Sequence, residues 1–404
     1  MRIAVATVGT AGDVVPFAIL ARALVARGHQ VTAVTWPVHR ATLAQPGVRV
    51  EVAGPHADPG RIASVAAEAA RHGPMAQVAI LRDFHLADGE AHYRRLRTLL
   101  PGHDLALIHG IHTLAHAAVL DDGLRWASVM FDPVLLPTAT TPPPGMPSLG
   151  PLNRVAWRLL DGLLARAGRP LDDLLARAGS EQRGLPMFRG RSSRLHVVAC
   201  SPSLIVVPPD LPPGTQVTGA WLDRSEPRPL PAELAAFLDD GAPPVVIAFG
   251  SMAGASDAVL ADAIRRLLES GARIVVQGPM AGELGSPSLL RIGSVDHRGL
   301  FPRAGLVVHH GGAGTTHAAC AAGVPSLVVP HVGDQRYWGD RLHRLGMAPE
   351  ALPVDGLRAE RLTEAARIAL ADREMRSRAQ ELATRLSAED GVGTTVTLLE
   401  RIGH

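Results

Sequence analysis

The chain has 404 residues, of which 47% are hydrophobic and 19% are charged, and its formal net charge is +2. This composition excludes a disordered protein, and the length indicates two or three domains of ~150 residues each. All 40 basic residues are Arg. The absence of Lys excludes chemistry that needs a lysine, such as a Schiff base with pyridoxal phosphate. The small net charge argues against a nucleic-acid partner.

The two cysteines, Cys200 and Cys320, are too few for a disulfide framework or a four-cysteine zinc site. The opening apolar run, residues 3–8, is too short for a signal peptide and is followed by no small-residue cleavage site. No uninterrupted apolar run reaches the ~18 residues that a membrane span needs. We therefore expect a cytoplasmic protein without a transmembrane segment.

The first 35 residues have the pattern of a βαβ unit. An apolar strand over 2–8 is followed by the glycine turn Gly9-Thr-Ala-Gly12, by a helical pattern from Pro16 to Gly28, and by a second strand over 31–35. This order predicts a parallel sheet. Further strands are expected at 49–53, 105–109, 126–130 and 196–200, with helices between them.

Two segments interrupt this alternation. Residues 138–151 are rich in proline, which predicts an irregular loop. Residues 155–179 have the pattern of two amphipathic helices rich in Leu and Arg. Packing of these helices on their own domain is the default interpretation, and docking on a membrane or on a partner is the alternative.

After a second proline-rich stretch the opening pattern returns, as a strand over 244–249, the turn Gly250-Ser251, a helix over 257–270 and a strand over 273–277. We therefore predict an α/β protein with two Rossmann-like, doubly wound parallel-sheet domains that face each other across a cleft. The expected bounds are 1–208 for the N-terminal domain, 209–230 for the linker, 231–385 for the C-terminal domain, and 386–404 for a C-terminal helix packing back on the N-terminal domain.

The strongest chemical signal is the motif His309-His-Gly-Gly-Ala-Gly-Thr-Thr316, which follows an apolar strand and opens a helix of small residues. Its glycines let the backbone approach a ligand closely, and the free N–H groups at the start of the helix suit a phosphate. The hydroxyls of Thr315 and Thr316 and the imidazole of His310 add hydrogen-bonding groups. A tight strand–helix turn without a ligand is the alternative.

A second polar pair, Asp334 and Gln335, follows the next expected strand, within 323–330. Ligands of open α/β sheets bind outside the carboxyl ends of the strands. A carboxylate beside an amide offers the acceptors and donors that neighbouring sugar hydroxyls require. Capping of a helix N-terminus by this pair is the alternative.

These motifs resemble the donor signature of the family 1 nucleotide-sugar glycosyltransferases, and most closely that of the bacterial branch that glycosylates antibiotics and sterols. The resemblance is dense over 245–346 and patchy in the N-terminal half. Its motifs in this chain are 309–316, Gly323-Val-Pro325, Asp334-Gln335, Trp338-Gly339, Gly12-Asp-Val-Val-Pro16, Gly28-His-Gln-Val31, Gly184-Leu-Pro186 and Phe249-Gly-Ser251.

The resemblance implies the two-domain GT-B fold, with the acceptor in the N-terminal domain and a UDP- or dTDP-sugar in the C-terminal domain. Val295 and His297 would contact the nucleobase. Plant members carry a Trp just before this point, where this chain has Ser294, so both nucleotides stay open. The implied donor-binding residues are Ser251, Val295, His297, His310, Gly312, Ala313, Gly314, Thr315, Asp334 and Gln335.

The resemblance also implies that Asp13 is the catalytic base, at a position where many relatives have His. A carboxylate is a weak base, but it can serve if the proton moves late, as the new C–O bond forms. Two alternatives remain. Asp13 could cap the helix that we expect to begin near Val15, and His109 or His112 could be the base in its place.

The implied reaction is a single in-line displacement that inverts the anomeric carbon, so that an α-linked donor yields a β-glycoside. The helix end at 309–316 and His310 would stabilise the leaving diphosphate without a metal or another cofactor. His112 and His116 have the i, i+4 spacing of a possible metal site, but no Glu follows His112 as in the metalloprotease pattern.

The implied acceptor is a hydroxyl of a hydrophobic natural product, such as a polyketide, a macrolide, an aromatic compound or a sterol-like compound, and the transferred sugar is a hexose or deoxyhexose. A nucleotide-sugar epimerase, or a nucleotide-binding auxiliary protein whose catalysis has decayed, is the alternative. A homodimer and an activating partner protein both stay open. The candidate acceptor contacts are Thr10, His109, Phe131 and Met146.

Overall fold

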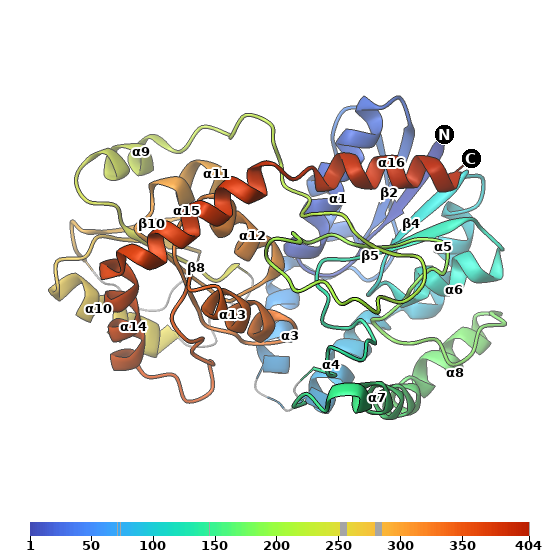
Figure 1. The fold of residues 1–404 in the computed structure, drawn as a ribbon. Coiled ribbons are helices and arrows are strands. Elements are labelled where there is room, and N and C mark those ends of the chain that lie inside the picture. The colour runs from blue at the N-terminus through green and yellow to red at the C-terminus, as the bar shows by residue number, and fades with distance from the viewer. Residues whose placement is uncertain (71, 73, 145, 251–256, 279–284, 404) are drawn as a thin grey trace. The chain divides into compact units, whose positions relative to one another are not determined.

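The structure is a computed structural model, which describes every residue except 71, 73, 145, 251–256, 279–284 and 404. The chain divides into two units (Figure 1). Unit 1 comprises Met1–Ile62, Val78–Leu222 and Asp390–His404, and unit 2 comprises Ala63–Gln77 and Asp223–Glu389. The change from unit 1 to unit 2 after Leu222 falls inside the proline-rich segment 209–230 that we expected to be the linker.

Unit 1 is built on a seven-stranded parallel sheet with the strand order β3-β2-β1-β4-β5-β6-β7. All five residues of β4 are buried, as expected for a parallel strand that is covered on both faces. The strand order reverses between β1 and β4, which is where open α/β sheets bind ligands. The strands are β1 (Arg2–Ala6), β2 (Gln30–Thr35), β3 (Val48–Val52), β4 (Leu105–His109), β5 (Trp126–Met130), β6 (His196–Val198) and β7 (Thr215–Val217).

The helices of this part of the chain cover the sheet. The two amphipathic helices expected over 155–179 are confirmed as α7 and α8, and the proline-rich segment before them contains no strand in its described residues. Within α3 and α4, residues 63–77 group with unit 2. The helices are α1 (Ala11–Ala26), α2 (Arg40–Leu43), α3 (Pro59–Ala70), α4 (Pro74–His85), α5 (Gly89–Leu99), α6 (Thr113–Asp121), α7 (Asn153–Ala167) and α8 (Arg169–Arg177), with 3₁₀ turns η1 (Pro37–His39) and η2 (Gly150–Leu152).

The first helix begins earlier than we predicted. α1 starts at Ala11, so that Pro16 lies inside the helix rather than at its first position. Thr10 is the N-cap residue, and its side chain and that of Asp13 form a reciprocal capping box. This pairing satisfies N–H groups at the start of the helix and sets its boundary. Pro16 lacks an N–H and therefore leaves one carbonyl of the first turn without its helical donor.

Unit 2 is built on a five-stranded parallel sheet with the order β10-β9-β8-β11-β12. Alternate residues of β8 enter two separate cores: Val245 and Ile247 pack with α10 and α14, whereas Val246 and Ala248 pack with α9 and α12. Helices thus cover both faces of this sheet. The strands are β8 (Val245–Ala248), β9 (Ile274–Gln277), β10 (Leu289–Ile292), β11 (Leu306–His309) and β12 (Ser326–Val328). The helices are α9 (Ala232–Asp239), α10 (Asp257–Glu269), α11 (His297–Leu300), α12 (Ala313–Ala321), α13 (Gln335–Arg344), α14 (Ala359–Ala371) and α15 (Arg373–Ser387), with the 3₁₀ turn η4 (Phe301–Arg303).

The C-terminal segment 386–404 is not the single helix that we expected. α15 ends at Ser387, and a separate helix, α16, spans Gly391–Gly403. Asp390 starts the new helix, because its Oδ1 accepts a hydrogen bond of 2.8 Å from the N–H of Gly393.

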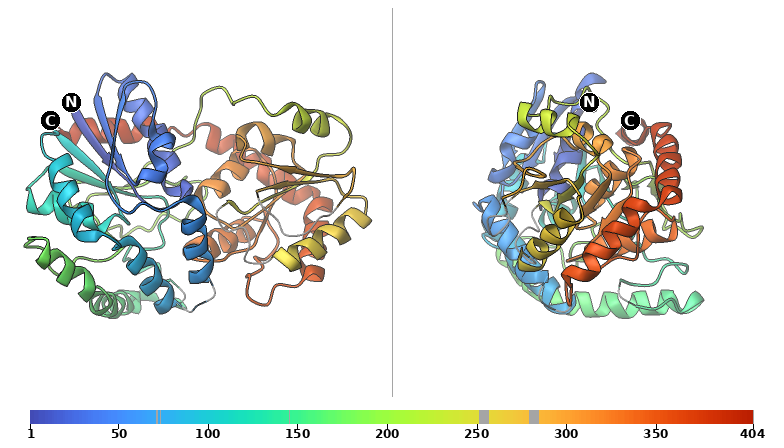
Figure 2. Two further views of the ribbon diagram at one scale, coloured as in Figure 1. Left: turned by 180° about the vertical axis from the view of Figure 1, so that it is seen from behind. Right: turned by 90° about the vertical axis from the view of Figure 1, so that its left-hand side faces the viewer.

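α16 belongs to unit 1 and packs against α1. The Trp221 indole N–H donates to Thr395 Oγ1 at 2.9 Å, and a Cβ on Gly391 would overlap the Gly219 carbonyl, so that glycine is required there. The two termini lie side by side in unit 1 (Figure 2). Among the described residues, no helix has the length and apolarity that crossing a bilayer requires.

Unit 1 buries several histidines whose rings are neutral at pH 7. His92, His116 and His196 are each at most 3% exposed. Burial lowers the pKa of His92 to about 4 and the pKa values of His116 and His196 to about 3, because the interior disfavours the charged imidazolium.

We predict that these histidines make unit 1 lose stability as the pH falls below about 6.5. In the unfolded chain each takes up a proton near its ordinary pKa of 6.5, whereas in the folded chain His92 stays neutral until about pH 4. The unfolded state therefore binds more protons, and the free energy of unfolding decreases by roughly 1 kcal/mol per histidine per pH unit in this interval. Urea titrations at about pH 7, 6 and 5 measure this slope, and His92→Gln should reduce it by up to one proton. A free energy of unfolding that is independent of pH in this range would contradict the prediction.

Candidate active site

Asp13 lies in the first turn of α1, directly after β1. Its Oδ2 accepts two hydrogen bonds from Thr10, one of 2.7 Å from the N–H and one of 2.9 Å from Oγ1. Its Oδ1 lies 4.0 Å from His109 Nε2, and the side chain is 29% exposed. The capping alternative is therefore correct in part, since Asp13 closes the capping box of α1. One carboxylate oxygen is held by Thr10, and the other faces His109.

His109 is the last residue of β4 and is buried. Its Nδ1 lies 3.3 Å from Thr7 Oγ1, and the same hydroxyl donates to the Asp13 carbonyl at 3.0 Å. Burial lowers the pKa of His109, and the negative charge of Asp13 opposes this effect only in part. The ring is therefore neutral at pH 7. A neutral imidazole beside a carboxylate offers a hydroxyl group both a donor and an acceptor.

Aromatic rings enclose the buried side of His109. The centroid of its ring lies 5.6 Å from that of Phe17 and 5.2 Å from that of Phe131, and Trp221 lies 5.4 Å from Phe131. These separations are typical of packed aromatic pairs. The structure thus brings Thr10, His109 and Phe131 together near Asp13. It leaves Met146, the fourth predicted acceptor contact, exposed on the proline-rich segment.

Thr7 and Asp132 were missed by the sequence analysis. Asp132 follows β5 and accepts a hydrogen bond of 2.8 Å from the N–H of Val134. Burial of the carboxyl group raises its pKa to about 6, and the negative charge of Asp13 adds to the rise. The sequence could have indicated Asp132, because it comes directly after the predicted strand next to the one that ends in His109. The carboxyl ends of neighbouring parallel strands lie side by side.

The possible metal pair, His112 and His116, does not form a helical i, i+4 face. His112 is the N-cap residue of α6, with a non-helical backbone, and its ring lies 5.1 Å from that of His92. His116 packs 5.1 Å from Trp126. Among the described residues, no group of three or more His, Cys, Asp or Glu side chains is placed to hold a metal ion.

In unit 2 the predicted phosphate motif forms a tight turn between β11 and α12. Gly311 has a φ of +87°, and a Cβ there would lie 2.7 Å from both the Gln335 carbonyl oxygen and Val328 Cγ1. A Cβ on Gly312, the N-cap residue of α12, would overlap the His310 ring. Nothing lies within 4 Å of the corresponding position on Gly314. The first two glycines are thus required by packing, and the third borders open space.

Four buried polar atoms around this turn have no hydrogen-bond partner in the part of the chain that the structure describes. Burial lowers the pKa of His309 to about 3 and that of His310 to about 4, so that both rings are neutral and each has one N–H to donate. Buried polar groups without partners are costly, and a bound ligand can supply the missing bonds. The four atoms are His309 Nε2, His310 Nδ1, Thr316 Oγ1 and His331 Nε2.

Asp334 and Gln335 lie where β12 leads into α13, and part of each side chain is already occupied. Asp334, the N-cap residue of α13, accepts a hydrogen bond of 2.6 Å from the Trp338 indole N–H. Gln335 Oε1 accepts hydrogen bonds from the N–H groups of His331, at 2.7 Å, and of Val332, at 3.0 Å. The capping alternative is thus correct for the position of Asp334. The carboxylate of Asp334 and the side-chain amide of Gln335 stay the predicted groups for binding a sugar.

The predicted nucleobase residues, Val295 and His297, flank Asp296 at the start of α11. Val295 packs on the core of unit 2. The His297 ring stacks on Phe301 with a centroid distance of 4.2 Å, and its Nε2 lies 2.8 Å from Gln277 Oε1. These contacts hold the loop at 295–298 in place. Contact of Val295 and His297 with a nucleobase stays a prediction.

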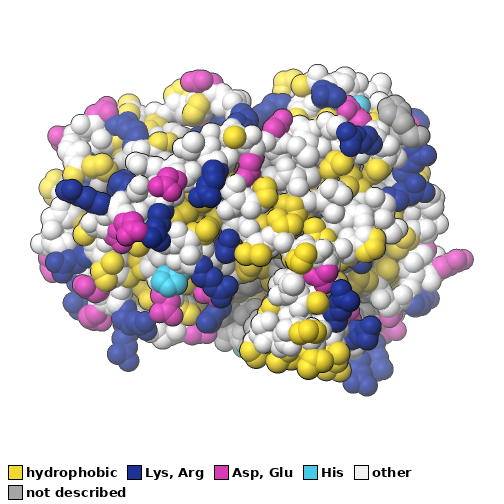
Figure 3. Space-filling view, viewed as in Figure 1, with side chains coloured by type: hydrophobic (Ala, Val, Ile, Leu, Met, Phe, Trp, Pro, Cys, Tyr) yellow, Lys and Arg dark blue, Asp and Glu magenta, His cyan; other side chains and the backbone are white. Residues whose placement is uncertain are grey.

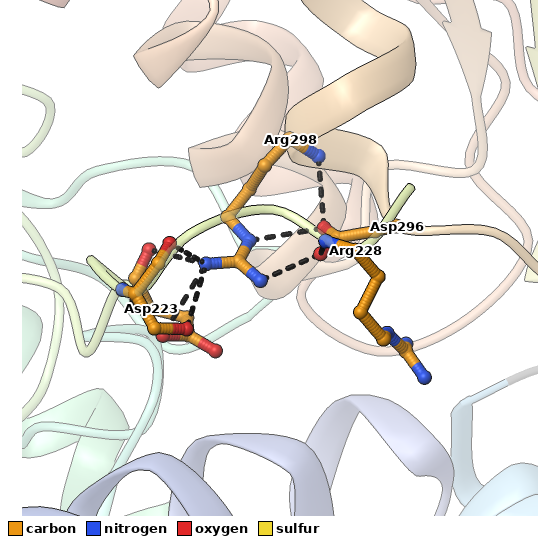
Figure 4. Close-up of polar contacts among 5 residues, drawn as sticks. Asp223, Arg228, Asp296 and Arg298 are labelled. Atoms are coloured by element: carbon orange, nitrogen blue, oxygen red, sulfur yellow. Dashed lines mark hydrogen bonds and ion pairs between the residues drawn. The ribbon is translucent and has the colours of Figure 1, made fainter. Parts of the chain in front are cut away.

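An ion-pair network that the sequence analysis missed secures the same loop (Figure 4). The Arg298 guanidinium donates to both carboxylate oxygens of Asp296, at 2.6 and 3.0 Å, and lies 3.3 Å from Asp223. The backbone N–H of Arg228 also donates to Asp296, at 3.1 Å. Arg298 therefore holds the pKa of Asp296 well below its usual range. The network ties the segment 223–228 to the loop at 295–298 within unit 2.

The remaining predicted donor residues differ in position. Ala313 and Thr315 are half-buried in the first turn of α12, whose free N–H groups point out of the helix. Ser251, predicted to assist from another loop, lies outside the described residues.

We predict that Gly311→Ala disrupts this turn, whereas Gly314→Ala, the matched control, leaves it intact. The first change forces a left-handed backbone on alanine and places its Cβ against the Gln335 carbonyl, at a cost of about 1–3 kcal/mol for the backbone alone. The second adds a methyl group to open space. Thermal unfolding should therefore show a lower melting temperature for Gly311→Ala only. Equal melting temperatures for the two variants would contradict the geometry described for Gly311.

Comparison with known proteins places the chain in a family. Residues 259–398 match the family described as erythromycin biosynthesis protein CIII-like, C-terminal domain. The chain is 33% identical over 428 aligned residues to O-mycaminosyltylonolide 6-deoxyallosyltransferase from Streptomyces fradiae, covering 99% of this chain and 97% of that protein. It is 31% identical to glycosyltransferase GtfE from Amycolatopsis orientalis, covering 86% of this chain and 85% of that protein.

Solved structures show the same fold. The glycosyltransferase of kitacinnamycin superposes with a TM-score of 0.72 at 20% identity, covering 99% of this chain and 98% of that one. Glycosyltransferase VinC, in complex with dTDP, superposes with a TM-score of 0.67 at 20% identity, covering 100% and 99%. The predicted α/β fold class is thereby confirmed as GT-B. The chain is a glycosyltransferase and belongs to the GT-B family of antibiotic and sterol glycosyltransferases.

Proposed function

We propose that this glycosyltransferase moves a hexose or deoxyhexose from a dTDP- or UDP-linked donor to a hydroxyl of a hydrophobic natural product. The observation that carries the proposal is the turn at 309–316, where buried imidazole and hydroxyl groups lack partners beside the N-terminus of α12. A diphosphate supplies the acceptor oxygens that these groups require, and the helix dipole attracts its negative charge.

The relatives support a dTDP-linked deoxysugar over the other donors. The Streptomyces fradiae relative is named for the transfer of 6-deoxyallose, and the VinC structure contains dTDP. The former is named for an O-mycaminosyltylonolide acceptor, which supports a macrolide-like acceptor for this chain.

Within this proposal the residues of unit 2 bind the donor. Neutral His310 donates to the diphosphate together with the backbone N–H groups at the start of α12. The carboxylate of Asp334 and the side-chain amide of Gln335 bind sugar hydroxyls. The full proposed set is Ser251, Val295, His297, His310, Gly312, Ala313, Gly314, Thr315, Asp334 and Gln335.

Asp13 in unit 1 acts on the acceptor. Its Oδ1 accepts the hydrogen bond of the attacking hydroxyl, while Thr10 holds Oδ2 and so orients the carboxylate. The hydroxyl oxygen attacks the anomeric carbon opposite the leaving diphosphate. The new C–O bond forms as the bond to the diphosphate oxygen breaks, which inverts the configuration at this carbon, and the proton passes to Asp13 late in the step. His109, 4.0 Å from Oδ1, can bind the same hydroxyl, and Phe131 limits the space beside it.

The proposed reaction needs no metal ion or further cofactor. The developing charge on the diphosphate is stabilised by the N-terminus of α12 and by the N–H groups of the imidazoles, which are fixed before the reaction begins. Transfer that is unchanged after treatment with a chelator would support this part of the proposal.

We predict that Asp13→Asn lowers turnover by about 10²–10⁴-fold, the range that general-base catalysis supplies. Asparagine keeps the shape and the bonds to Thr10 but cannot take up a proton. Release of dTDP from a dTDP-sugar, followed with a panel of macrolide and aromatic aglycones, measures turnover. The affinity for dTDP should not change, because Asp13 belongs to unit 1 and the donor residues belong to unit 2.

His109→Gln is the companion variant for this experiment. If Asp13→Asn retains wild-type turnover and His109→Gln does not, the base is His109 and the role proposed for Asp13 is wrong. If both lose turnover, both side chains contribute to activation of the acceptor hydroxyl.

We predict that dTDP raises the melting temperature of the protein and that the shift depends on His310. A nucleotide at about 100 times its dissociation constant stabilises the folded state by about 2.7 kcal/mol. His310→Ala and Thr316→Val remove partners of the diphosphate and should reduce the shift. Thr363→Val, which removes a hydroxyl bonded to the Ala359 carbonyl within α14, is the control that should leave the shift intact. A melting temperature that responds to neither dTDP nor UDP would refute the donor site.

The alternative of a nucleotide-sugar epimerase or a decayed auxiliary protein is not favoured, because the relatives that align along the chain are transferases. Incubation with donor alone separates the classes, since epimerisation without acceptor would show the epimerase.

A further inference from the structure

Helix α7 of unit 1 carries a row of apolar side chains that its own unit leaves uncovered. Leu152, the N-cap residue of α7, is followed at intervals of three or four residues by Val155, Leu159 and Leu163, so the four lie along one side of the helix. Their exposed fractions are 61%, 47%, 67% and 49%. A single exposed apolar residue is ordinary, whereas a contiguous row marks an interaction site. We call these four residues the α7 row.

The apolar surface continues into the segment before the helix. Met146 and Leu149 are 43% and 46% exposed. Figure 3 shows hydrophobic side chains gathered at the lower edge of this view, over α7, with Arg side chains beside them.

The charge beside the α7 row is positive. Arg158, Arg166 and Arg169 are exposed, and none of them has an ion-pair partner among the residues that the structure describes. The acidic residue on the exposed part of α7, Asp161, is paired with Arg189. α7 and the first residue of α8 therefore present guanidinium groups, without ion-pair partners in the described part of the chain, next to an aliphatic row.

The opposite side of α7 is fixed to unit 1. The Trp157 indole N–H donates to the Thr141 carbonyl at 2.8 Å, and Asn153 Nδ2 donates to the Ala139 carbonyl at 2.8 Å. Both side chains are buried. The α7 row is thus held in place by its own unit and does not depend on a partner to become helical.

We propose that α7 docks the protein on an anionic phospholipid surface, with the α7 row inserted at the boundary of headgroups and acyl chains and Arg158, Arg166 and Arg169 at the lipid phosphates. An apolar helix side next to cationic side chains is the combination that binds such interfaces, and each guanidinium near the surface adds attraction to anionic lipids.

A protein partner fits this surface less well. A stable protein interface takes about 20–30 residues from each side and is enriched in exposed aromatic residues. The α7 row is narrow and aliphatic, and the aromatic residue of the helix, Trp157, is buried. Docking through α7 is independent of the donor and base residues, and it would place the protein where lipophilic acceptors accumulate.

Co-sedimentation of the full chain with vesicles tests the proposal. We expect binding to phosphatidylcholine vesicles containing about one third phosphatidylglycerol, and weaker binding to phosphatidylcholine alone or at high salt, because salt screens the guanidinium–phosphate attraction. Combined Leu159→Glu and Leu163→Glu should lower partitioning at least tenfold. Combined Val206→Glu and Val207→Glu is the matched control, because these exposed residues of unit 1 lie outside the α7 row.

Replacing Arg158, Arg166 and Arg169 with Gln should remove the preference for anionic vesicles while leaving the α7 row intact. Melting temperatures check that each variant folds, and Leu159→Ser with Leu163→Ser replaces the Glu variant if that one unfolds.

Three results would overturn the proposal. The wild-type protein could fail to prefer anionic vesicles, or the row variant could bind as the wild type does. Sedimentation velocity could instead show a wild-type dimer that the row variant dissociates, without vesicle binding, which would assign the α7 row to a second copy of the chain.

Discussion

The close approach of two main-chain segments at Gly311 is the constraint on which the candidate donor site depends. The backbone bends there with a φ of +87°, and a side chain would meet the Gln335 carbonyl. Gln335 in turn accepts hydrogen bonds from His331 and Val332, so the connections after β11 and β12 are held together. The N-terminus of α12 and the carboxylate of Asp334 are consequently held close to each other at the carboxyl ends of β11 and β12. A surface made from backbone N–H groups tolerates no side chain between it and its ligand.

The proposed donor site and the proposed base both lie beside buried imidazoles without charge. His309 and His310 surround the turn in unit 2, and His109 faces Asp13 in unit 1. Burial keeps these rings neutral, because an imidazolium would lose its hydration. A neutral ring still offers one donor and one acceptor without the cost of burying a charge. This arrangement suits a chain whose basic residues are all Arg, since Arg is charged at every accessible pH.

Asp13 combines a structural and a chemical position. Its bonds to Thr10 complete the capping box of α1, and they also orient the carboxylate so that the second oxygen faces His109. The bonds that begin α1 therefore also fix the orientation of the proposed base. Asp334 likewise combines two positions, because it is the N-cap residue of α13, bonds to the Trp338 indole, and is a proposed sugar-binding residue.

The alternation of strands and helices at the start of each half, the doubly wound fold class and the glycine turn at 309–316 were predictable from the sequence, because they follow from local periodicity and from residues with few allowed conformations. The first residue of α1 was not predictable in this way. Pro16 suggested a helix that begins there, whereas the capping box of Thr10 and Asp13, which depends on side-chain geometry, begins the helix at Ala11. Nor could the contacts of Thr7 with His109 or of Arg298 with Asp223 be predicted. These pairs join residues distant in the chain, and their distances are set by sheet order and packing. The sequence by itself thus determined which chemical groups this protein has and on which elements they lie. Only the tertiary structure decided which of those groups are buried, neutral and without partners, because desolvation and hydrogen bonding depend on neighbours that no local pattern specifies.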